Sequence, residues 1–289
     1  MPSPHLTEPV PFRATLPASA FSVPVEGRKH SRGGPKAFLR LLPCRPESTG
    51  QRDRAGRSTD RGIRFRWQGG QQLGHDAWMK DWVAWHTAYD DPSSPLSERL
   101  MRVRSHLSDA IGQARAGRVS LVSLCAGQGH DVIGVVPHHP RREDVCAVLV
   151  EADERNVGLA RRAAAGQDLP QVEVRQADAG LVASFADALP ADILLLCGIF
   201  GNVSDRDIKQ TVQASAALCR TGATVIWTRH RRPPDLTPQV RAWFADSGFD
   251  EVAFERLQTS AMTSVGVSRL RRTSTAEPPE HRLFTFRAA

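Results

Sequence analysis

Short apolar runs alternate with helical segments from residue 119 onward, and this alternation restricts the fold more than any other feature of the sequence. The run 193–197 is apolar throughout, as in a central strand that is buried on both faces. Strand alternating with helix predicts a doubly wound, mostly parallel α/β sheet with helices on both faces. We expect residues 259–279 to be a polar connection before the last strand. The expected strands are 119–124, 145–150, 172–175, 193–197, 223–228, 251–255 and 282–286.

The first 75 residues differ from the rest in composition. They carry 13 Lys and Arg against 5 Asp and Glu, whereas the remaining residues carry 25 against 26. They are rich in Pro, Gly, Ser and Arg, and without an apolar period they cannot bury enough surface to offset their ordering entropy. We expect a disordered basic extension over 1–75. Two alternatives stay open: a tail that binds nucleic acid, and a start codon assigned too far upstream, with Met79 close to the first ordered-looking sequence.

Residues 76–117 predict an N-terminal helical segment. Its aromatic residues recur at spacings of 4, 3 and 4 from Trp78 to Tyr89, which places them on one face of a helix. A second helix is expected to begin after Ser94, a good N-cap residue, and to stop at Gly117. We expect the aromatic helix to fold over the sheet as a lid.

A glycine loop follows the first expected strand and precedes a short helix. The glycines of Cys125-Ala126-Gly127-Gln128-Gly129 allow a sharp turn and the close approach of a ligand. The second expected strand ends in Glu151, whose carboxylate can accept two hydrogen bonds from ribose hydroxyls. We assign Asp153 to capping the next helix. These features together predict a nucleoside site, although Glu151 could instead be an acid at a helix N-terminus.

The same loop favours a nucleoside cofactor without phosphates. A dinucleotide fingerprint needs a small residue where Val132 stands, and Asp131 at the helix N-terminus would repel a pyrophosphate. The sequence also lacks a GxxxxGK[ST] loop for a nucleoside triphosphate. S-adenosylmethionine, which carries a sulfonium and an amino group, tolerates nearby carboxylates.

Over roughly residues 95–287 the sequence resembles the class I S-adenosylmethionine-dependent methyltransferases. The resemblance lies in segments 122–129, 148–153, 174–179 and 192–198. It implies a Rossmann-like, seven-stranded sheet whose last strand is antiparallel, a methyltransferase domain over 118–289, and transfer of a methyl group from S-adenosylmethionine.

The resemblance also implies the cofactor contacts. Asp178 stands where the family commonly contacts the adenine amino group, and a turn residue without a ligand is the alternative. The first segment departs from the common form, because Cys125-Ala126 replace a frequent acidic residue and another small one. The residue that holds the methionine amino group is therefore left open. The expected cofactor-binding residues are Cys125, Ala126, Gly127, Gln128, Gly129, Glu151, Ala152, Asp178, Ala179, Cys197 and Gly198.

The methyl acceptor is expected beyond the carboxyl ends of the strands, where ligands bind in open parallel sheets. His230 follows the fifth expected strand among arginines, whose charge would hold its pKa low and suit it to act as a general base. A solvated basic loop is the alternative there, and lid packing is the alternative for His86. The substrate-side candidates are His86, Tyr89, Asn202 and Arg231.

The sequence also excludes several classes of function. The Asn/Asp-Pro-Pro-aromatic motif of enzymes that methylate amino groups in DNA is missing at 198–201. We therefore expect a small-molecule acceptor, and a protein acceptor is the less favoured alternative. Five cysteines without a CxxC pair predict reduced thiols and a cytoplasmic location. No metal-ligand spacing, membrane span or signal peptide is expected. Two alternative functions stay open: a non-catalytic cofactor-binding module and a nicotinamide-dependent oxidoreductase.

Overall fold

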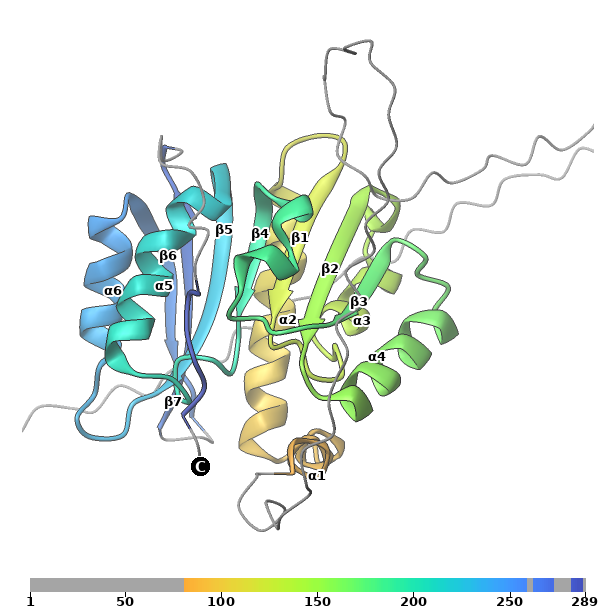
Figure 1. The fold of residues 1–289 in the computed structure, drawn as a ribbon, viewed down its shortest axis with the longest axis horizontal. Helices are drawn as coiled ribbons and strands as arrows, with labels where there is room; N and C mark the ends of the chain where they lie inside the picture. The colour runs from red at the N-terminus through yellow and green to blue at the C-terminus, as the bar shows by residue number, and fades with distance from the viewer. Residues whose placement is uncertain (1–80, 259–261, 273–281, 288–289) are drawn as a thin grey trace, which may run out of the picture. The chain divides into compact units, whose positions relative to one another are not determined.

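The computed structural model describes residues 81–258, 262–272 and 282–287. Within them, seven strands form one sheet in the order β3-β2-β1-β4-β5-β7-β6 (Figure 1). The five strands from β3 to β5 run parallel, and β7 runs antiparallel to both of its neighbours. The strands are β1 Val119–Leu124, β2 Val145–Glu151, β3 Val172–Gln176, β4 Ala191–Leu196, β5 Cys219–His230, β6 Phe249–Arg256 and β7 Thr263–Leu270.

Helices cover both faces of the sheet, and each face has its own apolar core. One core joins α5 and α6 to the sheet, and the other joins α2, α3 and α4 to its opposite face. The α-helices are α1 Trp82–His86, α2 Pro95–Gln113, α3 Val132–Val135, α4 Glu154–Gly166, α5 Asp205–Leu218 and α6 Thr237–Asp246. Short 3-10 turns are η1 Thr87–Asp90, η2 Val136–His138, η3 Arg142–Asp144, η4 Val182–Ser184 and η5 Ala186–Ala188. The predicted Rossmann-like, doubly wound fold with seven strands and an antiparallel last strand is therefore confirmed.

Side-chain caps fix where the helices begin. Ser94 Oγ accepts a hydrogen bond from Ser97 N at 3.1 Å and starts α2. Asp153 Oδ1 accepts one from Arg155 N at 2.8 Å and starts α4, as the sequence predicts. Because α4 starts two residues after β2 ends, the cap turns the chain sharply beyond the carboxyl end of that strand. The connection that follows β2 at this edge of the sheet is therefore short, and hydrogen bonds hold its conformation.

The C-terminal part corrects two predictions. The last strand is not 282–286, which forms only two isolated bridges, and residues 259–279 are not merely a polar connection, because β7 lies within them. Small and polar residues alternate with valines along β7, which hides its apolar pattern. Gly266 shows the reason for the small residues, since a Cβ there would lie 2.1 Å from the Trp227 ring. The side chains at the centre of β7 are small because the strand packs against the large Trp227 side chain of β5.

Only some of the N-terminal predictions concern residues that the structure describes. The extension over 1–75, Trp78 and Met79 lie outside the described residues. The aromatic helix is shorter than its pattern, since α1 gives way to a 3-10 turn at Thr87. Helix α2 ends at Gln113 rather than at Gly117. Gly117 instead has a φ of +80° in the turn that leads into β1. Among the described residues, no helix has both the length and the apolar character needed to cross a membrane.

Candidate functional site

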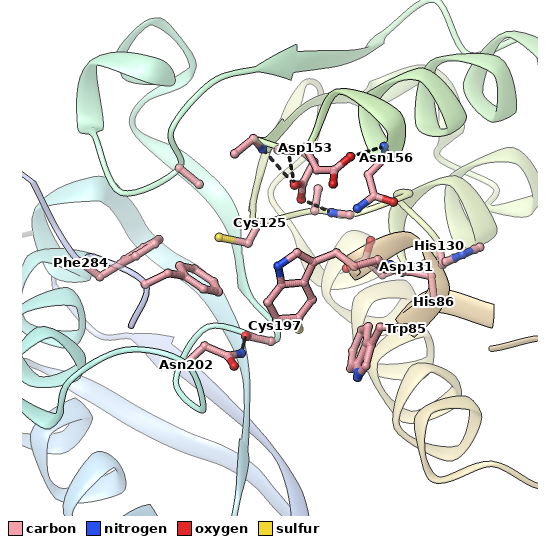
Figure 2. Close-up of a pocket in the computed structure, with 18 of the residues that line it drawn as sticks. Trp85, His86, Cys125, His130, Asp131, Asp153, Asn156, Cys197, Asn202 and Phe284 are labelled. Atoms are coloured by element: carbon pink, nitrogen blue, oxygen red, sulfur yellow. Dashed lines mark hydrogen bonds between the residues drawn. The ribbon is translucent and has the colours of Figure 1, made fainter. Parts of the chain in front are cut away.

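A cavity of about 1170 Å³ lies at the carboxyl ends of the parallel strands, beside α1 and η1. It is lined by the segment predicted as a lid (α1 and η1, called the lid below), by α2, by the glycine loop, by the end of β2 and the start of α4, by the loops after β3 and β4, and by the segment 282–287. Figure 2 shows His86, His130 and Asp131 on one side of this cavity, Phe284 and Asn202 on the other, and Cys125 and Cys197 between them.

Most of the predicted site residues line this cavity, and four do not. Gln128 and Gly129 belong to the glycine loop but face away from the cavity lining: Gln128 Nε2 donates to Asn156 Oδ1 at 3.3 Å, and a Cβ at Gly129 would meet Ile133 at 2.7 Å. His230 and Arg231 also lie outside the lining. The predicted residues that do line the cavity are His86, Tyr89, Cys125, Ala126, Gly127, Glu151, Ala152, Asp178, Ala179, Cys197, Gly198 and Asn202.

The glycine loop needs its unusual backbone because the lid packs directly on it. Cys125, Gly127 and Gly129 have φ values of +54°, +57° and +71°. A Cβ at Gly127 would lie 2.3 Å from His86 Nε2, closer than any two such atoms can approach. The left-handed backbone conformation therefore favours glycine at this position, and a larger residue there would force the His86 ring to move.

Glu151 holds the loop in place with its carboxylate. Its Oε2 accepts a hydrogen bond from Gly127 N at 2.7 Å, and its Oε1 accepts from Ala152 N at 3.0 Å and Asp153 N at 2.9 Å. A carboxylate has about four acceptor sites, so about one remains for a ligand that reaches the cavity wall. This is fewer than the two hydrogen bonds to ribose that the sequence analysis allowed.

The C-terminal segment 282–287 forms a further wall that the sequence did not reveal. Arg282 Nη1 lies 2.7 Å from Asp178 Oδ2, and Leu283 N donates to Gly180 O at 2.7 Å. Arg287 N then donates to Asn202 O at 2.8 Å. The segment thereby joins the loop after β3 to the loop after β4, the two loops that carry predicted ligand contacts. Its pattern predicted a strand of the sheet, whereas the segment forms only isolated bridges to Leu181 and Val203, which lie outside the strands.

Three rings gather where the lid meets the start of α3. The ring centroids of His86, Tyr89 and His130 lie 5.1 to 5.9 Å apart. His86 Nδ1 lies 2.5 Å from Trp82 O, and because a carbonyl only accepts, Nδ1 carries the proton and Nε2 is the acceptor. Burial raises the pKa of Tyr89 and lowers the pKa of His130. Near neutral pH the Tyr89 phenol and the His130 imidazole are therefore held in their neutral forms.

Several charged residues that the site prediction omitted also line the cavity, among them Asp131 and Arg99. Asp131 is 9% exposed, and burial raises the pKa of its carboxyl above the usual range. Arg99 of α2 donates from Nη2 to Tyr89 Oη at 2.6 Å. The signal for Asp131 was available, because an acid at the helix N-terminus had already argued against a pyrophosphate.

The loops after β4 and β5 meet at Gly201. Asn202 Nδ2 donates to Gly198 O at 2.7 Å, which fixes the side chain at the cavity. A Cβ at Gly201 would lie 3.3 Å from the His230 ring, so His230 packs behind this loop. Burial lowers the pKa of His230, and the charges of Arg229 and Arg232 lower it further, in the direction that the sequence predicted. Across the described ranges, no three His, Cys, Asp or Glu side chains cluster as metal ligands would.

The fold defined by this sheet and cavity is that of the class I S-adenosylmethionine-dependent methyltransferases. An O-methyltransferase family protein from Burkholderia thailandensis superposes with a TM-score of 0.51 at 15% identity, over 67% of this chain and 61% of that chain. The magnesium protoporphyrin IX methyltransferase of Synechocystis PCC 6803, crystallised with its bound methyl donor, gives 0.49 at 13% identity, over 65% of this chain and 90% of that one. Neither a protein-family profile nor a curated protein matches the sequence. The likeness establishes the fold.

Proposed function

We propose that this chain is an S-adenosylmethionine-dependent methyltransferase that acts on a small molecule. The observation that carries the proposal is the convergence of three elements on one cavity: the glycine loop, Glu151 and the Asp178-Ala179 turn. They come from the ends of β1, β2 and β3, beside the point where the strand order reverses between β1 and β4. Ligands of open α/β sheets bind in such crevices.

The residues at this edge fit a nucleoside donor. Glu151 has about one acceptor site left for a ribose hydroxyl after holding three backbone N–H groups. Asp178 and the buried Ala179 border the space next to it, where an adenine would lie. The glycine loop has no Cβ at Gly127, and the side chain that lies against this position is that of His86. When bound, the donor supplies an electrophilic methyl group on a sulfonium.

The chain's own contribution to transfer is positioning, exclusion of water and removal of a proton. The lid residues Trp82, Trp85 and His86 line the cavity and separate it from solvent on that side. His86 presents Nε2 as the acceptor nitrogen, which can take the proton of an acceptor hydroxyl or amine. His230 stays a proposed acceptor-side residue, reached by an acceptor that extends past Asn202 to the Gly201 loop.

A small acceptor fits this site better than a macromolecule. The cavity of about 1170 Å³ exceeds the space that a nucleoside-sized ligand fills, and aromatic side chains of the lid and of the C-terminal segment are among the residues that line it. Trp82 lies against Phe286, with ring centroids 6.2 Å apart, so the lid and the C-terminal segment meet over the cavity. This contact narrows the path by which a protein side chain or a nucleic acid could enter.

Isothermal titration of the full chain tests the proposal. We expect S-adenosylhomocysteine to bind and NADH not to bind, and we expect labelled methyl groups from S-adenosylmethionine to appear in the small-molecule fraction of a cell extract. The variant Gly127→Ala should lose binding, because its Cβ would occupy the position of His86 Nε2. Gly158→Ala in α4 is the matched control, since its Cβ would lie 3.5 Å from Arg162.

Two other outcomes of these experiments would favour the two alternative functions. Binding of NADH in place of S-adenosylhomocysteine would favour the oxidoreductase alternative. Binding of S-adenosylhomocysteine with no transfer across a wide acceptor panel would favour a non-catalytic module.

A further inference from the structure

Basic side chains gather next to the loops that follow β4 and β5. Arg287 lines the cavity, and its backbone N donates to Asn202 O at 2.8 Å. Arg229 Nη2 and Arg287 Nη2 lie 3.8 Å and 3.9 Å from one carboxylate oxygen, Asp205 Oδ1. The end of β5 and the segment 282–287 therefore meet beside Asn202, which Figure 2 shows on the Phe284 side of the cavity. We call Arg229, His230, Arg232 and Arg287 the basic rim.

The positive charge of the basic rim is only partly balanced. Asp205 is shared between two guanidinium groups, and both contacts are longer than a hydrogen bond. Arg232 is exposed and forms no ion pair within 4.0 Å inside the described ranges. Five arginines and three acids lie at this corner: Arg229, Arg231, Arg232, Arg256 and Arg287 against Asp205, Asp207 and Asp235. An excess of positive charge remains for an anionic ligand.

Arg229 places one of these charges below the surface. Its side chain is 9% exposed, and its guanidinium donates from Nη1 to Phe200 O. Its Nε is buried and has no hydrogen-bond partner among the described residues. A guanidinium stays protonated near neutral pH, so the buried charge persists there. An anion bound nearby would offset part of the cost of burying it.

His230 presents an N–H group on the side of the Gly201 loop. Its Nδ1 accepts a hydrogen bond from Arg232 N at 3.3 Å. Burial and the charges of Arg229 and Arg232 lower the pKa of His230, so the imidazole is neutral near neutral pH and carries its proton on Nε2. A Cβ at Gly201 would lie 3.3 Å from Cδ2 and 3.9 Å from Nε2 of this ring. The geometry favours a hydrogen-bond donor here, in place of the general base that the sequence suggested.

We propose that the basic rim binds an oxyanion group of the methyl acceptor, so that the acceptor is an anionic small molecule. The inference rests on the proposed function, in which the acceptor extends past Asn202 to the Gly201 loop. Arg287 and the Nε2–H of His230 donate to the oxyanion, and Arg229 adds positive charge behind them. Because His230 lies outside the cavity lining, the oxyanion is an anchor, and the methyl group goes to another atom of the acceptor.

The charge of the methylated product tests this inference. The full chain is incubated with methyl-labelled S-adenosylmethionine and the small-molecule fraction of a cell extract, and the products pass over an anion-exchange column at pH 7. S-adenosylmethionine is a cation at this pH and flows through. We expect the labelled product to be retained, and a labelled product in the flow-through would overturn the inference. Phosphatase treatment of the retained product then distinguishes a phosphate, which would be lost, from a carboxylate, which would stay.

An arginine variant assigns the oxyanion to the basic rim. Arg287→Gln should need roughly 10- to 100-fold more extract for half-maximal labelling, the effect of losing a charged hydrogen-bond partner. The maximal rate and the affinity for S-adenosylhomocysteine should change by less than about twofold. Arg271→Gln is the matched control. Arg271 pairs with Asp250 at 3.4 Å and follows β7 at the opposite edge of the sheet.

Two variants of His230 separate a hydrogen-bond donor from a general base. His230→Ala should need roughly 10-fold more extract for half-maximal labelling. His230→Gln should recover most of this loss, because its side-chain amide can donate an N–H close to the position of Nε2. A general base would be lost in both variants.

The outcomes separate this inference from the proposed function. If the wild type does not bind S-adenosylhomocysteine, or if it binds but labels no product, the proposed function itself is wrong. If the wild type labels a product and Arg287→Gln needs no more extract than Arg271→Gln, the oxyanion site is wrong while the function stands. If His230→Gln and His230→Ala both lower the maximal rate and leave the half-maximal extract unchanged, His230 is a base and the assignment to the oxyanion is wrong.

Discussion

The carboxylate of Glu151 accepts a hydrogen bond from the backbone N of Gly127 at 2.7 Å, so the end of β2 holds the glycine loop that follows β1. The two segments are 24 residues apart in the sequence, and the parallel register of β1 and β2 brings them together. Because the same carboxylate also borders the cavity, ligand binding and loop structure are coupled at this residue.

The variant Glu151→Ala should therefore affect both binding and stability. The sequence indicated a ligand contact at Glu151. The structure adds the loss of hydrogen bonds to the backbone N of Gly127, Ala152 and Asp153. We expect S-adenosylmethionine binding to weaken by roughly 1–3 kcal/mol and the melting temperature to drop as well. Titration calorimetry and thermal unfolding measure the two effects.

Glu154→Ala provides the comparison for that experiment. Glu154 is an exposed residue in the first turn of α4, so its loss should change the free energy of unfolding by no more than about 0.5 kcal/mol. An affinity at Glu151→Ala equal to that of the wild type would remove Glu151 from the ribose site.

The C-terminal segment should contribute to the cavity through Phe284. This side chain is 2% exposed within the core that covers one face of the sheet, and it also lines the cavity. We expect Phe284→Ala to lower the free energy of unfolding by roughly 3–5 kcal/mol and to weaken donor binding. Thr285→Ala is a control for stability alone: Thr285 also lines the cavity, but it is exposed and bonds to Asp207 through its backbone N, so the free energy of unfolding should change by no more than about 0.5 kcal/mol. Chemical denaturation of both variants decides whether the segment is part of the folded wall.

Acidification should destabilise the protein through His130. Burial holds the pKa of His130 below its ordinary value of 6.5 in the folded chain. The unfolded chain therefore takes up this proton first as the pH falls through 6.5. The free energy of unfolding consequently decreases from that pH down to the folded pKa, by at most about 1.4 kcal/mol per pH unit for one proton. Below the folded pKa the loss levels off.

His130→Gln should make this pH dependence shallower. Urea denaturation between pH 8 and pH 5 measures it, and the difference at pH 8, where the imidazole is neutral in both states, gives the contribution that does not depend on charge. The pKa of His230 is also lowered by burial, so the double variant should be shallower still. Slopes equal to those of the wild type would contradict the burial of a neutral His130.

The sequence predicted the parallel half of the fold well, because there each signal is local. The expected strand 119–124 coincides with β1, and Asp153 caps α4 as expected. Apolar runs buried on both faces, glycine turns and capping side chains all act within a few residues. The folded protein keeps these local conformations because its tertiary contacts stabilise the same conformations.

The parts that the sequence missed depend on contacts between distant residues. Strand β7 is defined by its pairing with β5 and by the Trp227 ring over Gly266. The wall at Phe284 exists because the C-terminal segment returns to loops that lie about 80 to 100 residues earlier. For the same reason Asp131 stood out only as an acid at a helix start, since its burial comes from packing that no local pattern encodes.

Removal of residues 1–74 should leave the folded part intact. Every described strand lies after residue 118, and the two cores that cover the sheet start at Val103 and Val122. The extension lacks a periodic apolar face of its own. We expect the shortened chain to keep the melting temperature and the donor affinity of the full chain. A shortened chain that fails to fold would move the domain boundary toward the N-terminus.

The two candidate histidines should separate in a kinetic comparison once an acceptor is known. His86 lines the cavity with Nε2 as its acceptor nitrogen, whereas His230 packs behind Gly201. We expect His86→Gln to lower kcat by roughly 100-fold or more, the usual effect of losing a general base. His230→Ala should lower turnover through the acceptor while donor affinity changes by less than about threefold, or roughly 0.65 kcal/mol. Steady-state kinetics with donor titrations of both variants separate these effects. Full turnover in His86→Gln would remove it as the base, and full turnover in His230→Ala would place that residue in a solvated loop.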